Sequence, residues 1–433
     1  MESWYFNGLG IDMDYQQELI TTIHDFGCDL SVLEARMEQL SQESPTAVLI
    51  PALFEELERP ALTQIRDHLI RCVGFVNTVV VCLYAQTTEQ YRHAVQFFDC
   101  LPQKTYVIWE NGPGVTRLLA SLQDQGLNLL SFRGKGRAVW LGLGVATLEA
   151  DAIALHDADI TTYDRTYPLK LLYPLLEKEF GIAFNKAYYA RLGDPPSSFY
   201  GRVVRLFVTP LLTAMIDLFG AQNYLCYLNA YRYPLSGEFA LTSDLALNIR
   251  IPSNWGLEIG FLAEVYRNIA LKRIAQVDLG LFEHKHQALG LSTDEGLQKM
   301  CRDIMRSLLR TLTETEQVVI SLEHVHALRV KFRRKAQDYT HQYFVDATFN
   351  QLRYDRHREE VAVELFEQVL LEAGELYFQD PSGAQIPAWT RALAVVPDLR
   401  EQLCDAAQRD AADTRTIQIP VGQPDIASDP IPA

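Results

Sequence analysis

The sequence predicts an α/β protein in which a largely parallel sheet lies between helices and is followed by a mainly helical region. Between residues 47 and about 290, short β-like apolar runs alternate with helical stretches. From residue 292 onward, apolar residues instead recur at helical spacing. The apolar run Ala152–Leu155 ends abruptly on His156, Asp157, Ala158 and Asp159. Such a pattern is typical of a buried parallel strand that presents polar groups at its carboxyl end, where open α/β sheets bind their ligands.

The elements before the helical region follow from local patterns. Residues 13–42 have apolar faces at helical spacing, broken near Gly27, and predict an amino-terminal helical segment over residues 1–45. The domain over residues 46–291 has five successive strand candidates, namely Val48–Ile50, Thr78–Val81, Thr105–Ile108, Leu127–Leu130 and Ala152–Leu155. A later strand-like run is Gln276–Gly280, and Phe261–Ile269 is an expected helix.

The carboxyl-terminal part divides into an extension and a tail. Amphipathic stretches that start at Gln298, Ala336 and Glu359 predict a helical extension over residues 292–412. Four prolines fall within the last twenty residues, from Thr414 onward. We therefore predict a disordered tail over residues 413–433.

Composition excludes several classes of protein. The net charge of −16 argues against nucleic acid or an anionic membrane as the main partner. Seven scattered cysteines without a CxxC pair indicate neither a disulfide framework nor a zinc site. No apolar run reaches the roughly 18 residues of a membrane span, and the amino terminus has no signal-peptide pattern. We expect a soluble cytoplasmic protein.

Asp157 and Asp159 are candidate metal ligands. Two acids two residues apart can both lean toward one hard cation once a strand loosens into a loop. Oxygen ligands are what Mg²⁺ or Mn²⁺ on a diphosphate requires. Asp-x-Asp pairs are also common in solvated turns, so the pair alone leaves both interpretations open.

Two loops are candidate phosphate or nucleoside sites. The segment Ile50–Glu56 can present backbone groups and an acid to a nucleoside, or can simply open a helix whose amino terminus favours acids. In the segment Arg133–Ala138, Lys135 stands between Gly134 and Gly136. Glycines let a backbone approach a ligand and the lysine can neutralise a phosphate or a carboxylate, but a solvated basic turn has the same pattern.

Three later ionisable residues are further candidates for the site. Glu238 and Glu258 each stand between small and apolar residues, so each carboxylate is expected to be partly buried and to need a partner. Glu258 also suits the start of a helix. His284 follows the strand-like run that ends at Gly280, and a neutral imidazole can complete a coordination sphere of carboxylates, although a lone histidine is more often structural.

Read in order, the motifs resemble the glucosyl-3-phosphoglycerate synthases, which are retaining glycosyltransferases of GT-A type. The matching blocks are Ile50–Glu56, Gly134–Trp140, His156–Ile160, Lys186–Arg191, Gly201–Val203 with Thr209–Leu212, Leu235–Leu241, Gly256–Leu262, Ala275–Gly280 and Glu283–Leu289. The resemblance implies a GT-A type (Rossmann-like) nucleotide-sugar-binding domain. It also implies a Mg²⁺- or Mn²⁺-dependent homodimer that transfers a hexose, expected to be glucose, from UDP- or GDP-glucose to 3-phosphoglycerate. The product would be glucosyl-3-phosphoglycerate, the precursor of the compatible solute glucosylglycerate.

The resemblance also implies roles for single residues. The nucleotide-sugar site would comprise Pro51, Ala52, Leu53, Glu55, Lys135, Asp157, Leu235 and Glu258. The metal would be held by Asp157, Asp159 and His284, with Asp159 the stronger candidate for direct contact. The catalytic set would be Glu238, which orients the sugar, with Lys135 and Asp159. The acceptor site would comprise Gly201, Arg202, Val204 and His286.

The sequence departs from the family pattern on the acceptor side. Tyr200, Val204 and His286 stand where the family usually has Gly, Thr and Asn. Valine cannot donate the hydrogen bond that a threonine hydroxyl offers to a phosphate. One alternative is therefore another small acid as acceptor, and a mannose donor is a separate alternative. A metal-dependent nucleotidyltransferase and a non-catalytic sugar-nucleotide-binding protein are alternatives from other classes.

Overall fold

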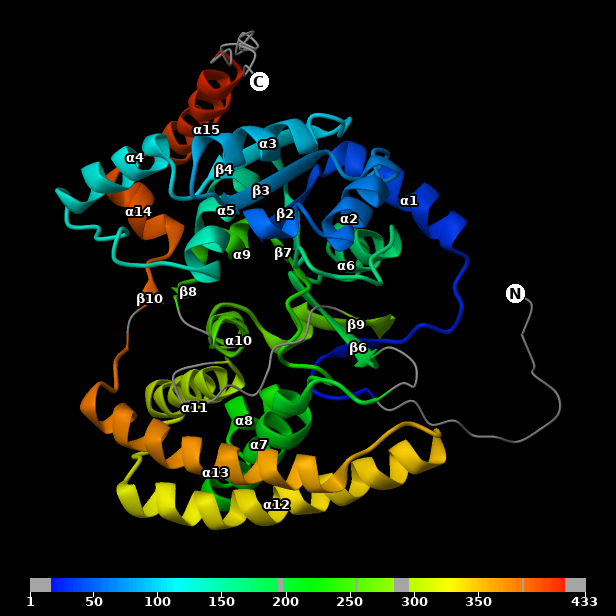
Figure 1. Cartoon of the computed structure of the whole chain (residues 1–433), viewed down its shortest axis with the longest axis vertical. Helices are drawn as coiled ribbons and strands as arrows, with labels where there is room; N and C mark the ends of the chain where they lie inside the picture. Colours follow the sequence, from blue (N-terminus) through cyan, green and yellow to red (C-terminus); the bar gives the residue numbers. More distant parts are fainter. Residues whose placement is uncertain (1–16, 194–197, 254–255, 284–295, 384, 417–433) are drawn as a thin grey trace, which may run out of the picture.

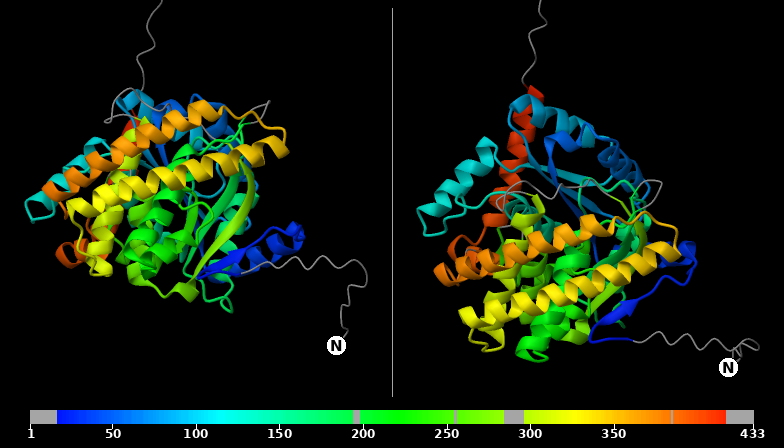
Figure 2. Two further views of the ribbon diagram at one scale, coloured as in Figure 1. Left: turned by 90° about the horizontal axis from the view of Figure 1, so that it is seen from below. Right: turned by 60° about the horizontal axis from the view of Figure 1, so that its bottom comes forward.

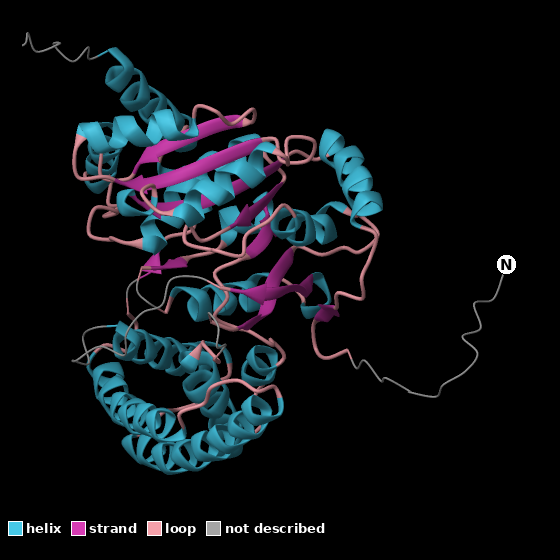
Figure 3. Cartoon of the chain, turned by 45° about the vertical axis from the view of Figure 1, so that its right-hand side comes forward, coloured by secondary structure: helices cyan, strands magenta, loops and turns pink. Residues whose placement is uncertain are grey.

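The computed structural model describes residues 17–193, 198–253, 256–283, 296–383 and 385–416. The fold is built around an eight-stranded mixed sheet of order β1-β9-β6-β7-β5-β2-β3-β4. Its strands are β1 (Thr21–Ile23), β2 (Thr46–Leu53), β3 (Thr78–Tyr84), β4 (Lys104–Trp109), β5 (Ala152–Leu155), β6 (Phe184–Arg191), β7 (Phe239–Thr242) and β9 (Ile274–Phe282). All neighbouring pairs are parallel except those of β7, which runs antiparallel to β5 and β6. Figure 3 shows this twisted sheet among its helices.

The sheet is buried on both faces because its strands are continuously apolar. Successive side chains point to opposite faces. Accordingly, Leu49 and Val80 belong to one hydrophobic core, and Val48 and Val79 belong to the other. The second core also receives side chains from α1 (Leu30–Glu43), α2 (Pro60–Ile70), α3 (Thr88–Phe98) and α6 (Thr166–Leu176). The first core receives them from α4 (Pro113–Gln123), α5 (Lys135–Glu149), α7 (Thr209–Phe219), α8 (Asn223–Asn229), α9 (Ser243–Asn248) and α10 (Leu257–Asn268).

The carboxyl-terminal region is helical, as predicted, and lies along the domain that contains the sheet. It comprises α11 (Gly296–Thr315), α12 (Leu322–Phe349), α13 (Arg356–Gln379), α14 (Trp389–Val395) and α15 (Leu399–Thr416). In Figure 1, α12 and α13 cross the lower part of the molecule near α7, whereas α15 lies at the top beside α4. The short strand β10 (Gln385–Ile386) pairs antiparallel with β8 (Ile251–Pro252). Figure 2 shows α12 and α13 lying side by side over the same face of the molecule.

Most strand predictions are confirmed. The candidates at Val48, Thr78, Thr105, Ala152 and Gln276 lie in β2, β3, β4, β5 and β9. The predicted helix at Phe261 lies in α10. Glu258 is in the first turn of this helix. Within the described residues, no helix combines the length and the apolar character needed to cross a membrane.

The predicted helix over residues 13–42 is wrong in the described residues before Leu30. Thr21–Ile23 forms β1, which pairs in parallel with β9, and Thr22 accepts a hydrogen bond from the Gln276 side chain at 2.9 Å. This long-range pairing outweighs the local helical pattern. The helix starts only at Leu30, where the Asp29 side chain accepts a hydrogen bond from the backbone of Ser31.

The predicted strand Leu127–Leu130 is also wrong. Leu127 and Leu129 are buried in the first core, but their backbone is held in turns, with the Leu127 amide donating to Leu122 and the Phe132 amide donating to Leu129. An apolar run can therefore pack without pairing as a strand.

The predicted disordered tail begins too early. α15 continues to Thr416, and the Thr414 carbonyl accepts a hydrogen bond from Arg92 at 2.9 Å. The tail residues 417–433 lie outside the described residues. The domain boundaries at 46 and 292 stay predictions.

Candidate active site

Lys135 lies at the centre of a charged cluster at the carboxyl end of β5. Its ammonium group is 2.7 Å from Asp157 Oδ1 and 3.3 Å from Glu258 Oε1. Burial opposes the positive charge, but the two carboxylates outweigh that effect and raise the pKa of Lys135. The structure thus brings together three predicted site residues from three separate elements.

Glycines on both sides of the cluster allow its close packing. Gly136, the second residue of α5, lies so close to the Pro252 carbonyl that a Cβ atom would collide with it. Gly237 lies against the Asp157 carboxylate in the same way. A larger residue at Gly136 would push the two segments apart, and a larger residue at Gly237 would displace the Asp157 carboxylate. Gly237 of the Leu235–Leu241 motif therefore leaves room for the Asp157 carboxylate, which follows the neighbouring strand β5.

Glu238 is a fully buried acid beside this cluster. Tyr189 donates a hydrogen bond to Oε2 at 3.0 Å, and Oε1 has no hydrogen-bond partner within the described part of the chain. Burial, together with the negative charge of Asp157, raises the pKa of Glu238 to about 8, against the opposing effects of Lys135, Tyr189 and Lys186. An unpaired buried carboxyl oxygen is costly, so this atom is suited to receive a ligand hydroxyl.

Lys186 is buried and held by the same segment. Its ammonium group donates to the Ser236 carbonyl at 2.7 Å. Burial lowers its pKa to about 8, partly offset by Glu258 and Glu238. Lys186 thereby fixes the loop that carries Glu238. Leu235 is half-buried at the start of that loop, between the two hydrophobic cores.

The predicted nucleotide-binding residues lie at the end of β2. The strand continues through Pro51 and Ala52 to Leu53, which pairs with Tyr84, so these residues do not form a loop after the strand as predicted. Leu53 and Glu55 are exposed, and Glu55 lies in the short 3₁₀ turn that follows. β2 is the direct neighbour of β5, so its end lies at the same edge of the sheet as the aspartates.

His284 and His286 lie outside the described residues, so their contacts are untested. Glu283, the residue before His284, accepts hydrogen bonds from the backbone and hydroxyl of Thr161 at 2.9 and 3.1 Å. Its own amide donates to the Thr162 hydroxyl at 3.1 Å. The residue before His284 is therefore anchored to Thr161, which follows the half-buried Asp159 by two residues in the sequence.

In the segment predicted to bind the acceptor, two arginines share one acid from the carboxyl-terminal region. Glu359 of α13 is 2.7 Å from Arg202 Nε and 3.0 Å from Arg205 Nη2. Glu359 is 4% exposed. Arg205 also lies over the rings of Phe199 and Tyr343, at 5.6 and 4.8 Å from their centroids. Helices α12 and α13 therefore hold the segment that carries the predicted acceptor residues.

The other predicted acceptor residues flank this ion-pair cluster. Gly201 precedes a turn of π-helix, Val203–Val208, and its carbonyl accepts from the Arg205 amide at 3.0 Å. π-Helical turns occur frequently at functional sites. Val204 is buried in the second hydrophobic core.

Comparison with known proteins decides the family. No family-level profile matches the chain. It is 47% identical over 401 residues to a glucosyl-3-phosphoglycerate synthase from Methanococcoides burtonii, covering 93% of this chain and 99% of that protein. The chain belongs to the glucosyl-3-phosphoglycerate synthase family. A second member, from Persephonella marina, is 38% identical over 404 residues and is 99% covered.

A solved family structure supports the fold. The glucosyl-3-phosphoglycerate synthase of Mycobacterium tuberculosis, crystallised with Mn²⁺, UDP-glucose and phosphoglyceric acid, has a TM-score of 0.50 and 25% identity. The match covers 68% of this chain and 88% of that structure. The protein with the present sequence is therefore a glycosyltransferase with the predicted GT-A type fold.

The sequence alone did not indicate that Glu359, Arg205 and Tyr343 belong to the candidate site. The local signals were ordinary, because Glu359 lies in the first turn of an amphipathic helix and Arg205 lies within an apolar run. Glu359 is 157 residues from Arg202 in the sequence. Only the packing of α13 against the π-helical turn brings them together.

Proposed function

We propose that this glycosyltransferase moves glucose from UDP-glucose to 3-phosphoglycerate and forms glucosyl-3-phosphoglycerate. The observation that carries the proposal is the Lys135–Asp157–Glu258 cluster beside the buried Glu238, built from the motifs that characterise the family. It is supported by 47% identity along 99% of a glucosyl-3-phosphoglycerate synthase. The M. tuberculosis relative contains UDP-glucose and phosphoglyceric acid in its crystal structure.

The proposed enzyme uses Mg²⁺ or Mn²⁺, held by Asp157, Asp159 and His284. Carboxylate oxygens and an imidazole suit either cation. Within the described residues, no three acidic, histidine or cysteine side chains are grouped to hold a metal ion, and His284 lies outside these residues. When bound, the metal would offset the negative charge that accumulates on the leaving diphosphate.

The protein side chains position the reactants and balance their charges. Lys135 holds Asp157 and places a positive charge near the diphosphate. Glu238 accepts a hydrogen bond from a sugar hydroxyl through its unpaired oxygen and orients the ring. In the proposed front-face route, the bond from the sugar C1 to the diphosphate breaks while the acceptor oxygen bonds to C1 on the same face. The acceptor proton passes to the departing diphosphate, and no carboxylate of the enzyme attacks the sugar.

A product screen tests the proposed function. Purified protein is incubated with UDP- and GDP-linked glucose and mannose, against 3-phosphoglycerate, glycerate and related acids. We expect glucosyl-3-phosphoglycerate from UDP-glucose. Release of free glucose without transfer would instead indicate a sugar-nucleotide-binding protein with residual hydrolysis. Formation of a nucleotide sugar from a sugar phosphate would indicate a nucleotidyltransferase.

Arg202→Lys is expected to raise the KM for 3-phosphoglycerate about ten-fold or more and to leave the KM for the donor nearly unchanged. The guanidinium gives its Nε edge to Glu359, while its Nη groups have no partner among the described residues. A lysine cannot hold both the glutamate and an acceptor phosphate in this forked geometry. Initial rates at varied acceptor concentration measure the effect. Equal use of unphosphorylated glycerate, or an unchanged KM, would contradict the phosphate-site assignment.

We also propose that the enzyme is a homodimer. Three apolar side chains of α12, Val330, Val345 and Phe349, are 72%, 53% and 84% exposed. Large exposed apolar side chains on one helix favour an interface between proteins. Light scattering coupled to size-exclusion chromatography at micromolar protein should give twice the mass of the chain. A monomer mass would contradict the proposal.

A further inference from the structure

A cavity of about 630 Å³ opens between the catalytic domain and the carboxyl-terminal helices, and the Lys135 cluster does not line it. One wall is the turn segment Gly126–Phe132, and another is the last part of α11 with the segment after α13. Three arginines reach this cavity, namely Arg250, Arg310 and Arg391. Only one acid, Glu314, lines it among the described residues.

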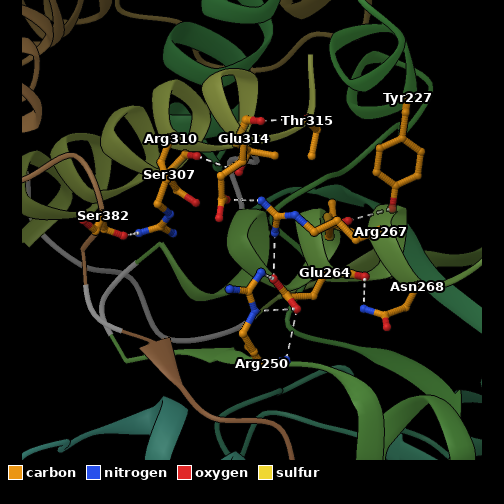
Figure 4. A network of polar contacts seen from close by, with 12 residues as sticks. Tyr227, Arg250, Glu264, Arg267, Asn268, Ser307, Arg310, Glu314, Thr315 and Ser382 are labelled. Carbon is orange, nitrogen blue, oxygen red and sulfur yellow. Dashed lines mark hydrogen bonds and ion pairs between the residues drawn. The ribbon is translucent and has the colours of Figure 1, made fainter. Parts of the chain in front are cut away.

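Arg310 has a partly satisfied guanidinium group in this cavity. Its Nη1 donates to the Ser382 carbonyl at 3.3 Å, and its Nε is buried without a hydrogen-bond partner within the described residues. Burial lowers the pKa of Arg310, and the positive charges of Arg267 and Arg250 add to that effect against the opposing charge of Glu314. Figure 4 shows Arg310 directed toward Ser382.

The neighbouring acids are already engaged by other arginines. Glu264 pairs with Arg250 at 3.0 Å and with Arg267 at 2.7 Å, and Arg267 also pairs with Glu314. Arg310 and the exposed Arg391 have no ion pair with a described residue. Four guanidinium groups thus face two carboxylates at this junction, which leaves an excess of positive charge.

We propose that this cavity binds a small anion that carries a phosphate group. Arg310 and Arg391 would supply charge-assisted hydrogen bonds, which arginine makes to phosphate in a bidentate geometry. The side chain of Asn128 adds an uncharged donor to the lining. The volume lies in the range of small-molecule sites.

The position of the cavity gives such a ligand a structural role. The turn segment Gly126–Phe132 leads directly to Gly134 and Lys135, whereas Arg310 and Arg391 belong to the carboxyl-terminal region. A phosphate held between them would bind the folded arrangement of both parts and not the unfolded chain. Phosphate would therefore stabilise the protein by mass action.

Calorimetric titration of the full-length protein with inorganic phosphate and with glycerol 2-phosphate, at constant ionic strength, tests the proposal. The titration is performed in an Arg202→Gln background, so that binding at the acceptor site does not contribute. Arg310→Gln and Arg391→Gln are each expected to weaken binding about ten-fold or more. Arg334→Gln is the matched control, because that arginine is 77% exposed on α12 and does not line the cavity.

The outcomes separate clearly. Binding of both probes, lost in the two cavity variants and kept in the control, supports a site for phosphate esters. Binding of inorganic phosphate alone with the same pattern identifies free phosphate as the ligand. Arg391 is exposed, so its replacement is compatible with folding and keeps the test decisive if the Arg310 variant is unstable. Absence of binding, or equal affinity in all variants, overturns the proposal.

Discussion

Chelation of divalent metal is expected to reduce glucosyl transfer to the background rate, and added Mg²⁺ or Mn²⁺ is expected to restore it. Asp159→Asn should lower kcat by about a hundred-fold or more, because an amide is a weaker ligand for a hard cation and leaves the charge of the diphosphate less compensated. The measurement combines initial rates across metal concentrations with direct titration of Mn²⁺ into the donor-free protein. Asp157→Asn should lose activity as well, since it also removes a partner of Lys135.

Asp151→Asn provides the matched control for the metal experiment. Asp151 is an exposed aspartate that precedes β5, whereas Asp157 and Asp159 follow it. Its replacement should leave metal affinity and transfer unchanged. Full activity and metal affinity in His284→Ala would show that this histidine is not a ligand. Undiminished transfer in the presence of excess chelator would overturn metal dependence altogether.

Glu359→Gln is expected to weaken both the fold and the use of the acceptor. The substitution keeps the size of the side chain and removes the charge that compensates Arg202 and the buried Arg205. Loss of one partner of a buried ion pair costs about 3 kcal/mol of the free energy of unfolding. Because Glu359 also fixes the orientation of Arg202, the KM for 3-phosphoglycerate should rise about ten-fold, with little change in the KM for the donor. Urea unfolding and initial-rate kinetics measure the two effects.

Glu360→Gln is the control for this second prediction. Glu360 is the next residue of α13, but it is exposed, and among the described residues its one ion pair is with Arg356 on the same helix. An exposed pair of this kind contributes at most about 0.5 kcal/mol. If Glu359→Gln destabilised the protein and left the acceptor KM unchanged, Glu359 would have a structural role only. Equal behaviour of the two variants would contradict both effects.

The two experiments bear on different parts of the site. The metal experiment concerns residues that the family motifs pointed to, and the Glu359 experiment concerns a contact with the carboxyl-terminal extension. That contact joins α13 to Arg202 and Arg205, and an effect of Glu359→Gln on the acceptor KM would give the extension a role in the reaction. We expect such a variant of α13 to change acceptor use without a change at the donor site.

The sequence by itself determined the elements whose signal is local. The apolar run Ala152–Leu155 is β5 with the predicted bounds, because four buried residues followed by acids leave little other choice. The family could be inferred from the order of short motifs. The same local reasoning failed at Thr21–Ile23 and at Leu127–Leu130, where a distant strand or a set of turns decides the backbone.

Tertiary structure alone decided which charges meet. Lys135 lies 123 residues before Glu258, and Arg202 lies 157 residues before Glu359, so no periodicity links them. The roles of the site residues stay predictions, but their neighbours are now defined. The physical reason is that the alternation of apolar and polar residues fixes how a segment folds locally. Burial of whole faces against one another fixes which buried charge must find which partner.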